Sequence, residues 1–262
     1  MDLKEIALNK SQKRHPWELA RIKVITHFIH RLQKTGKKTT SILDIGSGDT
    51  YLIKELSKQF SDAFFYAVDI GYDDEYVRTA NREFEKEQVK IRVFNNFAAA
   101  EQSMRSPADL VLLLDVIEHV PDDVQLLKEL NASPAIDQET IFLITVPAFQ
   151  KLFSAHDVFL GHYRRYNNQL LKKNISNAGL QVLGIGYFFT FLLIPRYLQV
   201  ITEKKDKDDK GVEGIGNWEG GPGISKALIT ALRVDFSISV FLRKLGIKLP
   251  GLSNYAICKR SA

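Results

Sequence analysis

The stretch from Ser41 to Leu56, SILDIGSGDTYLIKEL, constrains the fold more than any other part of the chain. A short apolar run ends at Asp44 and breaks into Gly46-Ser47-Gly48, after which an apolar spacing of helical type begins. This pattern predicts a strand, a tight glycine turn and a helix. Such a turn presents backbone N–H groups and a helix N-terminus to a nucleotide-like ligand, because glycine tolerates positive φ and lets a ligand approach closely. Glycine turns after strands are often only turns, so the rest of the chain has to decide.

Short apolar runs alternate with helix-forming patterns through the first 146 residues. Strands that alternate with helices in this way predict a parallel sheet covered by helices on both faces. We expect residues 1–262 to form one domain of this α/β class. Strands are predicted at 41–45, 63–69, 89–94, 108–115 and 140–146, and helices at 17–33, 50–60, 73–87 and from Pro121 onward.

Past residue 146 the pattern changes. Residues 155–166, AHDVFLGHYRRY, are predicted to form a loop. Residues 195–250 are predicted to be an insertion whose charged and glycine-rich part, 203–223, is flexible. The remaining elements are predicted as a helix at 167–178 that Gly179 ends, a strand from Leu180, an amphipathic helix at 224–245 and a closing strand at 252–258.

The apolar stretch Val182–Val200 has nearly the length of a membrane span, with 19 residues and one charge. It also contains Gly184, Gly186 and Pro195, and its first residues are β-branched or aromatic. These features favour a buried strand that runs into a second element. Peripheral contact with a membrane stays open as an alternative.

Charge is concentrated at the N-terminus. Residues 1–38 hold ten Lys and Arg against three acidic residues, a net +7, although the whole chain carries only +5. Such a basic helical arm could face nucleic acid, anionic lipid or an acidic substrate, or could simply be a solvated helix face. The single cysteine, Cys258, and the lack of an apolar signal sequence favour a reducing, cytoplasmic location.

The positions of the residues in the glycine turn distinguish it from two other nucleotide-binding motifs. The dinucleotide-binding fingerprint G-x-G-x-x-G requires a glycine where this chain has Tyr51. A P-loop is excluded because no Gly-Lys-Ser/Thr follows. The second predicted strand ends at Asp69, 25 positions after Asp44, and a carboxylate there can accept hydrogen bonds from both ribose hydroxyls.

Three segments in this order resemble the class I S-adenosylmethionine-dependent methyltransferases: LDIGSGDT at 43–50, YAVDI at 66–70 and ADLVLLLDVIEHVPDD at 108–123. The closing segment GLSNYAICKR, 251–260, is also similar to that family. The resemblance implies a doubly wound, seven-stranded Rossmann-like sheet that is mostly parallel and has an antiparallel last strand. It also implies S-adenosylmethionine as the cofactor.

The same resemblance implies roles for residues along the predicted strand ends. Asp44 and the glycine turn would surround the methionine part of the cofactor, and Asp69 would take the ribose. Asn96 stands where the family usually has an acidic side chain for the adenine, and Thr50 replaces the third glycine of the turn. The full set of expected cofactor residues is Asp44, Gly46, Ser47, Gly48, Asp69, Ile70, Asn96 and Asp115, the last bordering the methyl group.

Acceptor residues are expected after the fourth and fifth strands, because the ligand crevice of such sheets lies at the carboxyl ends of the strands. The loop SAHDVFLGHYRRY resembles a subgroup associated with glycan, lipid or secondary-metabolite pathways, and HPWELAR at 15–21 resembles its opening and is expected to form a lid. His156 or His162 could act as a general base, and Arg164 or Arg165 could clamp a phosphate or carboxylate. The expected catalytic residues are His119, His156 and His162, and the expected substrate-binding residues are Tyr163, Arg164 and Tyr166.

Each of these residues also has a structural explanation. His119 could pack the turn before Pro121, His156 could bond to Asp157, and the tyrosines could pack the sheet edge. No metal is expected, because His156 and His162 are six residues apart, no cysteine is near, and the sequence offers no obvious third ligand.

The predicted activity is direct SN2 methyl transfer from S-adenosylmethionine to a small-molecule, glycan or lipid-linked acceptor. An RNA or protein methyltransferase that uses the basic arm is an alternative. Nucleic acid is the weaker choice, because the chain has little aromatic–basic interleaving and no Asn-Pro-Pro-Tyr-like motif after the fourth strand. A cofactor-binding partner subunit without catalytic activity is a further alternative.

Overall fold

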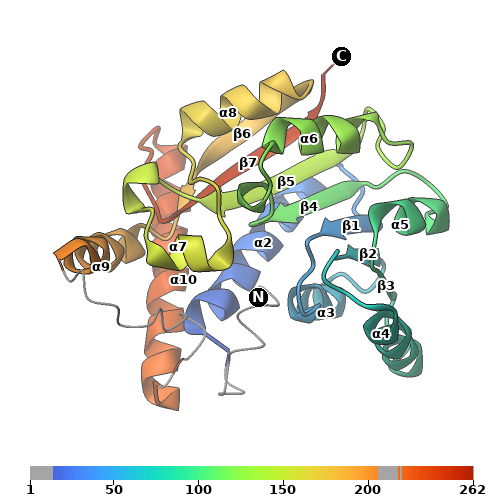
Figure 1. The fold of residues 1–262 in the computed structure, drawn as a ribbon, viewed down its shortest axis with the longest axis horizontal. Coiled ribbons are helices and arrows are strands. Elements are labelled where there is room, and N and C mark those ends of the chain that lie inside the picture. Colours follow the sequence, from blue (N-terminus) through green and yellow to red (C-terminus); the bar gives the residue numbers. More distant parts are fainter. Residues whose placement is uncertain (1–13, 206–217, 219, 262) are drawn as a thin grey trace.

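The computed structural model describes residues 14–205, 218 and 220–261. Seven strands form one sheet in the order β3-β2-β1-β4-β5-β7-β6 (Figure 1). Neighbouring strands pair in parallel except β7, which is antiparallel to both β5 and β6. This confirms the predicted sheet. The strands are β1 (Ser41–Ile45), β2 (Phe64–Val68), β3 (Ile91–Phe94), β4 (Leu110–Leu114), β5 (Ile141–Pro147), β6 (Leu180–Phe188) and β7 (Ser253–Arg260).

Helices pack on both faces of the sheet because both faces are apolar. All five residues of β4 are buried, as a strand covered on both sides requires. One hydrophobic cluster joins the sheet to α2 (Pro16–Lys34), α3 (Tyr51–Gln59), α4 (Asp74–Lys86) and α10 (Pro222–Lys244). The second cluster joins it to α5 (Phe97–Ser103), α6 (Asp123–Ala132) and α8 (Asn168–Asn177).

Two short helices escaped the sequence analysis. The predicted loop at 155–166 contains α7 (Ala155–Leu160), which begins with a capping box between Ser154 and Asp157. The alanine-rich helix α5 begins at a cap formed by Asn96. Both helices are too short to show a clear 3.6-residue repeat, which explains why the pattern missed them.

The apolar stretch 182–200 forms most of β6, a turn of 3-10 helix at Thr190–Leu192, and the first part of α9 (Leu193–Lys205). The predicted strand followed by a second element is confirmed, but the strand is not buried as expected: β6 lies at the edge of the sheet, and only three of its nine residues are buried. Within the described ranges, no helix combines the length and apolar character needed to cross a bilayer.

The predicted flexible segment 203–223 is too long, because its first and last residues belong to helices. Helix α9 continues to Lys205 and α10 already begins at Pro222, where the proline takes an N-terminal position that needs no backbone N–H. Residues 206–217 and 219, on which the rest of that prediction falls, lie outside the described residues. The amphipathic helix predicted at 224–245 is confirmed as α10.

Candidate functional site

The glycine turn after β1 is held between the neighbouring strands. Gly46 and Gly48 have φ of +72° and +57°, a region that glycine enters without steric cost. The backbone N–H groups of Gly46 and Ser47 donate to the Val68 carbonyl at 2.8 and 3.1 Å. A Cβ atom on Gly46 would lie 2.6 Å from a methyl group of Val116, so only glycine fits here.

Asp69, at the end of β2, ties the turn to the next loop. Its Oδ2 accepts from the Gly48 N–H and its Oδ1 from the Gly71 N–H, each at 2.8 Å. A carboxylate offers about four acceptor positions, so this half-buried side chain can accept further bonds from ribose hydroxyls. The neighbouring Ile70 is 93% exposed, an unusual position for a large apolar side chain beside a site.

Asp44, the last residue but one of β1, lies beneath the turn and is 2% exposed. Burial, followed by the negative charge of Asp69, raises the pKa of Asp44 to about 7. A cationic ligand group beside it would stabilise its ionised form. The positive sulfonium and amino groups of S-adenosylmethionine are groups of that kind.

Asn96 has a local role that the sequence analysis missed. Its Oδ1 accepts from the Ala99 N–H at 2.9 Å and caps α5, while its Nδ2 donates to Asn95. The side chain is exposed. Its expected contact with adenine stays a prediction.

Asp115 follows β4 with a φ of +59°, which turns its side chain toward the N-terminal helix. Its Oδ2 lies 2.7 Å from the Arg21 guanidinium, and Arg21 also donates to the Thr145 hydroxyl at 2.7 Å. The sequence analysis did not single out Arg21, because its partners are about a hundred residues away. This contact closes the start of α2 over the carboxyl edge of β4 and β5.

A second contact brings the same helix end to the glycine turn. Arg14 forms an ion pair with Asp49, and its guanidinium lies 4.0 Å from the centre of the Tyr51 ring. The His15 ring, which caps α2, meets Trp218 edge-on at 5.0 Å. These contacts are compatible with the lid expected from HPWELAR. The first thirteen residues of the predicted arm lie outside the described residues.

Asp157 organises the loop after β5. Fully buried, it contacts His162 Nδ1 at 2.9 Å, Arg165 Nε at 2.7 Å and Arg196 at 3.2 Å. Burial alone would raise the pKa of Asp157, but the hydrogen bond from His162 and the charge of Arg165 hold it well below its usual range. The adjacent His156 is buried, and burial followed by the charge of Arg196 lowers its pKa to about 4.

The three residues expected to bind the substrate differ in how exposed their side chains are. Tyr166 is completely buried and donates to Asp123 at 2.6 Å, so it supports the loop from within the core and has no surface for an acceptor. Arg164 is ion-paired with Asp123 at 3.2 Å. Tyr163 is 56% exposed and remains available to a ligand.

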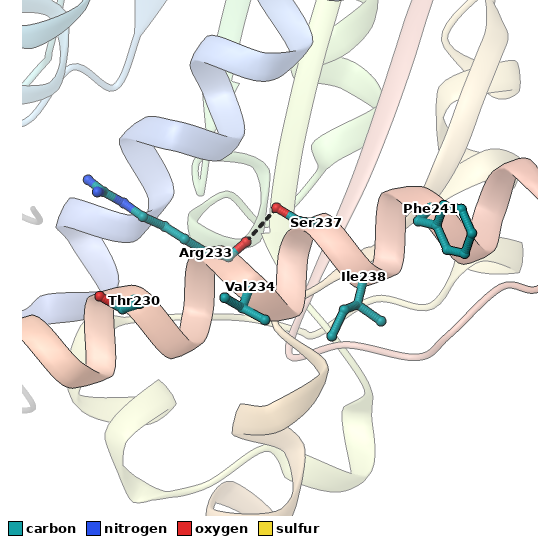
Figure 2. Close-up of a pocket in the computed structure, with 6 residues that line it drawn as sticks. All are labelled: Thr230, Arg233, Val234, Ser237, Ile238 and Phe241. Carbon is teal, nitrogen blue, oxygen red and sulfur yellow. Dashed lines mark hydrogen bonds between the residues drawn. The ribbon is translucent and has the colours of Figure 1, made fainter.

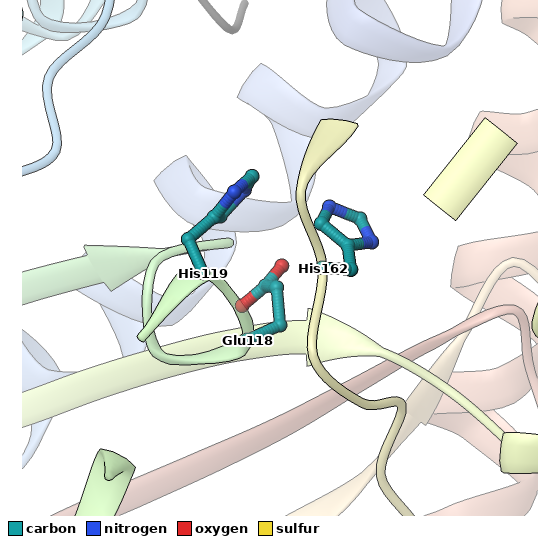
Figure 3. Close-up of side chains that lie close together, drawn as sticks. All are labelled: Glu118, His119 and His162. Atoms are coloured by element: carbon teal, nitrogen blue, oxygen red, sulfur yellow. The ribbon is translucent and has the colours of Figure 1, made fainter. Parts of the chain in front are cut away.

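His119 and His162 meet beside Glu118 at the carboxyl edge of β4 (Figure 3). The two imidazole rings are edge-on with centroids 4.5 Å apart. Glu118 is fully buried, and burial followed by the charge of Asp115 raises its pKa well above the usual value. Sequence analysis named both histidines but missed Glu118, although it lies within the quoted segment.

A family model described as a methyltransferase domain matches residues 17–184, well over half of the chain. The chain therefore belongs to this methyltransferase family. The glycine turn fits S-adenosylmethionine, the cofactor that the resemblance implies, because Gly46 and Gly48 bring backbone without side chains to the end of β1. The finer subgroup suggested by the loop at 155–166 stays a prediction.

One curated relative is a Methanocaldococcus jannaschii protein, MJ0046, with a provisional methyltransferase name. It is 28% identical over 94 residues, which are 36% of this chain and 35% of that one. This chain thus spans about a third of that relative's length.

Solved structures share the fold at low sequence identity. A protein of Galdieria sulphuraria assigned as a sarcosine dimethylglycine methyltransferase has a TM-score of 0.55 and 14% identity, over 91% of this chain and 86% of that one. The plantazolicin methyltransferase BpumL, in complex with S-adenosylhomocysteine, has a TM-score of 0.53 and 15% identity over 93% and 84%. The [4+2]-cyclase SpnF has a TM-score of 0.54 and 10% identity over 97% and 85%. Since one neighbour is a cyclase, the fold alone does not decide the reaction.

Proposed function

We propose that this enzyme methylates a lipid-linked or otherwise apolar acceptor at a membrane surface. The observation that carries the proposal is an exposed apolar face formed by α10 and the turn before α9, with further exposed apolar side chains on α9. Such faces on a single chain are typical of interaction sites. The proposal narrows the acceptor classes that the sequence leaves open.

The apolar face follows the spacing of a helix surface. Val234, Ile238 and Phe241 follow one another along α10, line a shallow groove and are 49%, 42% and 61% exposed (Figure 2). A second groove, lined in part by Phe191, continues from it at Val234. Further exposed apolar residues are Ile194, Tyr197, Leu198, Ile224, Leu245 and Ile247.

Basic residues flank this face. Lys226, Arg233, Lys244 and Lys248 are exposed, whereas the one acidic residue of α10, Asp235, is 1% exposed. An apolar helix face bordered by cations is the arrangement that binds the interface of an anionic bilayer. The long basic side chains can reach the headgroups while the apolar face enters the acyl boundary.

Helix α9 connects the apolar face to the acceptor loop. Its Arg196 side chain is buried against Asp157 and donates to Ser154 at 2.5 Å, while Ile194 and Leu198 of the same helix are exposed. Because residues two apart lie on opposite sides of a helix, Ile194 and Leu198 face away from Asp157, and α9 joins the apolar face on its outer side to the loop that carries His162 on its inner side. This supports delivery of the acceptor from the membrane side.

The chemistry requires mainly alignment. S-adenosylmethionine supplies a methyl group already activated by its sulfonium. The chain would hold the acceptor atom in line, and orientation of this kind can contribute about 7–11 kcal/mol. A hydroxyl acceptor also loses a proton, and the cluster at Glu118, His119 and His162 is the group of side chains best placed to assist that loss.

The RNA or protein alternative depends on free positive charge in the N-terminal arm. Of its seven described basic residues, Arg14, Arg21 and Lys37 are ion-paired with Asp49, Asp115 and Glu139, whereas Lys23, Arg31, Lys34 and Lys38 are exposed. Cations neutralised inside the chain contribute less to binding a polyanion. The exposed cations keep that alternative as an outcome that salt-dependent binding of RNA would reveal.

Vesicle co-sedimentation at low salt tests the proposal. We expect binding to vesicles that contain anionic phosphatidylglycerol, and at least a tenfold loss in an Ile238→Ser, Phe241→Ser double variant. Leu183→Ser, which removes an exposed apolar side chain from β6, is the matched control and should bind as the wild type does. Methyl transfer from labelled cofactor into a solvent-extractable lipid fraction should be equal for the wild type and Leu183→Ser and lower for the double variant. A wild-type protein that binds no vesicle would contradict the proposal.

A further inference from the structure

We propose that Glu118, His119 and His162 bind a divalent transition-metal ion. The site itself is independent of the acceptor. Its catalytic use, holding and activating an acceptor hydroxyl, rests on the proposed function.

The three side chains converge from two segments. Glu118 and His119 lie in the 3-10 turn Ile117–His119 that follows β4, and His162 follows α7. The Tyr163 N–H donates to the Glu118 carbonyl at 2.8 Å and fixes the segments against each other. One potential ligand atom from each residue lies within 4.8 Å of the other two. Metal–ligand bonds are about 2.0–2.2 Å, so a bound ion would draw the side chains inward.

The burial of the Glu118 carboxylate is offset only in part by the charges of Arg21 and Arg165. The residue is 0% exposed, and neither of its carboxylate oxygens has a hydrogen-bond partner among the described residues. The two nearby guanidinium groups are bonded elsewhere, Arg21 to Asp115 and Arg165 to Asp157. A buried carboxylate is normally paired or coordinates a metal, and Glu118 is aimed into the cluster (Figure 3).

His162 is oriented as a metal ligand would be. Its Nδ1 lies 2.9 Å from the Asp157 carboxylate, which favours the tautomer that donates from Nδ1 and leaves the Nε2 lone pair free to ligate. Asp157 is in turn held by Arg165 and Arg196. A carboxylate behind a histidine is a frequent support of metal sites.

Two histidines and one carboxylate are a ligand set of zinc and of other first-row divalent ions, and they leave coordination positions open. The set differs from the sequence expectation of no metal, which considered His156 together with His162. In the structure, the residues that lie beside His162 are Glu118 and His119, which directly follow β4. His156 is absent from the cluster.

An open position on the ion would take the acceptor oxygen. Coordination lowers the pKa of a bound hydroxyl, so the acceptor would release its proton to water. The oxygen would then form a bond to the methyl carbon while the carbon–sulfur bond breaks, and its electron pair would remain on sulfur as a neutral thioether. Charge and atoms balance without a further reactant.

Metal titration of chelator-treated, full-length protein tests the site. We expect one Co²⁺ per chain with the visible absorption of a low-coordinate site, and one Zn²⁺ by calorimetry with micromolar affinity. Glu118→Gln and His162→Gln should each weaken Zn²⁺ binding at least tenfold. His30→Gln changes an exposed histidine away from the cluster and should leave binding unchanged.

Binding of S-adenosylhomocysteine, followed in parallel, separates the possible outcomes. Variants that retain this binding are folded, so their loss of Zn²⁺ reports on the site. No saturable binding by the wild type, or equal binding by Glu118→Gln and His162→Gln, would overturn the metal site. Zn²⁺ binding by a wild type that binds no adenosyl compound would instead contradict the proposed function and leave the metal site standing.

Discussion

The two halves of the site are built in different ways. On the cofactor side, the glycine turn and Asp69 are joined mainly by backbone groups, with Gly46 and Gly48 in conformations that glycine favours. On the acceptor side, the loop is held by buried side chains. The Asp157 carboxylate contacts His162, Arg165 and Arg196. A backbone-built half needs a short local motif, whereas a side-chain network needs partners from several segments.

This difference has a consequence for function. A turn defined by backbone conformation can bind the same cofactor in many proteins, while a network of buried charges can be rearranged to suit a particular acceptor. We therefore expect substitutions in the two halves to have separable effects. Acceptor-side changes should reduce stability, and cofactor-side changes should act mainly on ligand affinity.

The largest effect is expected at Asp157. Asp157→Asn would remove the carboxylate that pairs with the buried guanidinium groups of Arg165 and Arg196, and breaking a buried pair in this way costs about 3–5 kcal/mol. Denaturant unfolding should show this loss. Asp62→Asn, an exposed carboxylate, is the control and should change the free energy of unfolding little. A loss under about 1 kcal/mol would show that the network is not what holds the loop.

A smaller loss of stability, about 2 kcal/mol, is expected for Gly46→Ala, with a large loss of cofactor affinity. A left-handed residue costs about 1–2 kcal/mol once it carries a Cβ atom, and that atom would also meet Val116. Gly184→Ala is the matched control, because a Cβ atom there meets nothing within 4 Å. Unfolding and cofactor titration of both variants measure the contrast. Equal behaviour of the two variants would remove the special role of Gly46.

The smallest effect, about 1 kcal/mol between pH 6 and pH 7, concerns the titration of Asp44. The pKa of Asp44 is raised from 3.8 to about 7 in the folded protein, so the unfolded chain loses this proton first. The stability of the folded protein should therefore fall as the pH rises between those two values, by about 1 kcal/mol per pH unit. Asp44→Asn should lose this part of the slope and bind the cationic cofactor more weakly. Unfolding of both proteins at pH 6 and pH 7 tests this, and identical slopes would show that Asp44 is not the responsible group.

The comparison also explains what could be predicted from the sequence. The alternation of strands and helices around the glycine turn, the positions of Gly46 and Asp69 and the amphipathic α10 follow from local patterns. The contact between Arg21 and Asp115 joins two segments that are far apart in the sequence, and no local pattern predicts that they lie side by side. The capping box at Ser154 was a local signal that could have revealed α7.

Other acceptor-side features depend on packing. Tyr166 was expected to meet the substrate, yet its hydroxyl is satisfied by Asp123 inside the core. No sequence pattern distinguishes Glu118. Its assignment to the site rests on its complete burial beside two histidines. Burial and long-range pairing are tertiary properties, so a single sequence does not display them.

Calorimetric titration of wild type and Asp69→Ala with S-adenosylmethionine, S-adenosylhomocysteine and NAD tests the central claim most directly. We predict micromolar binding of both adenosyl compounds by the wild type, no binding of NAD, and affinity at least tenfold weaker for Asp69→Ala. If the wild type bound neither adenosyl compound, or if Asp69→Ala bound them as tightly, the glycine turn would not be the cofactor site.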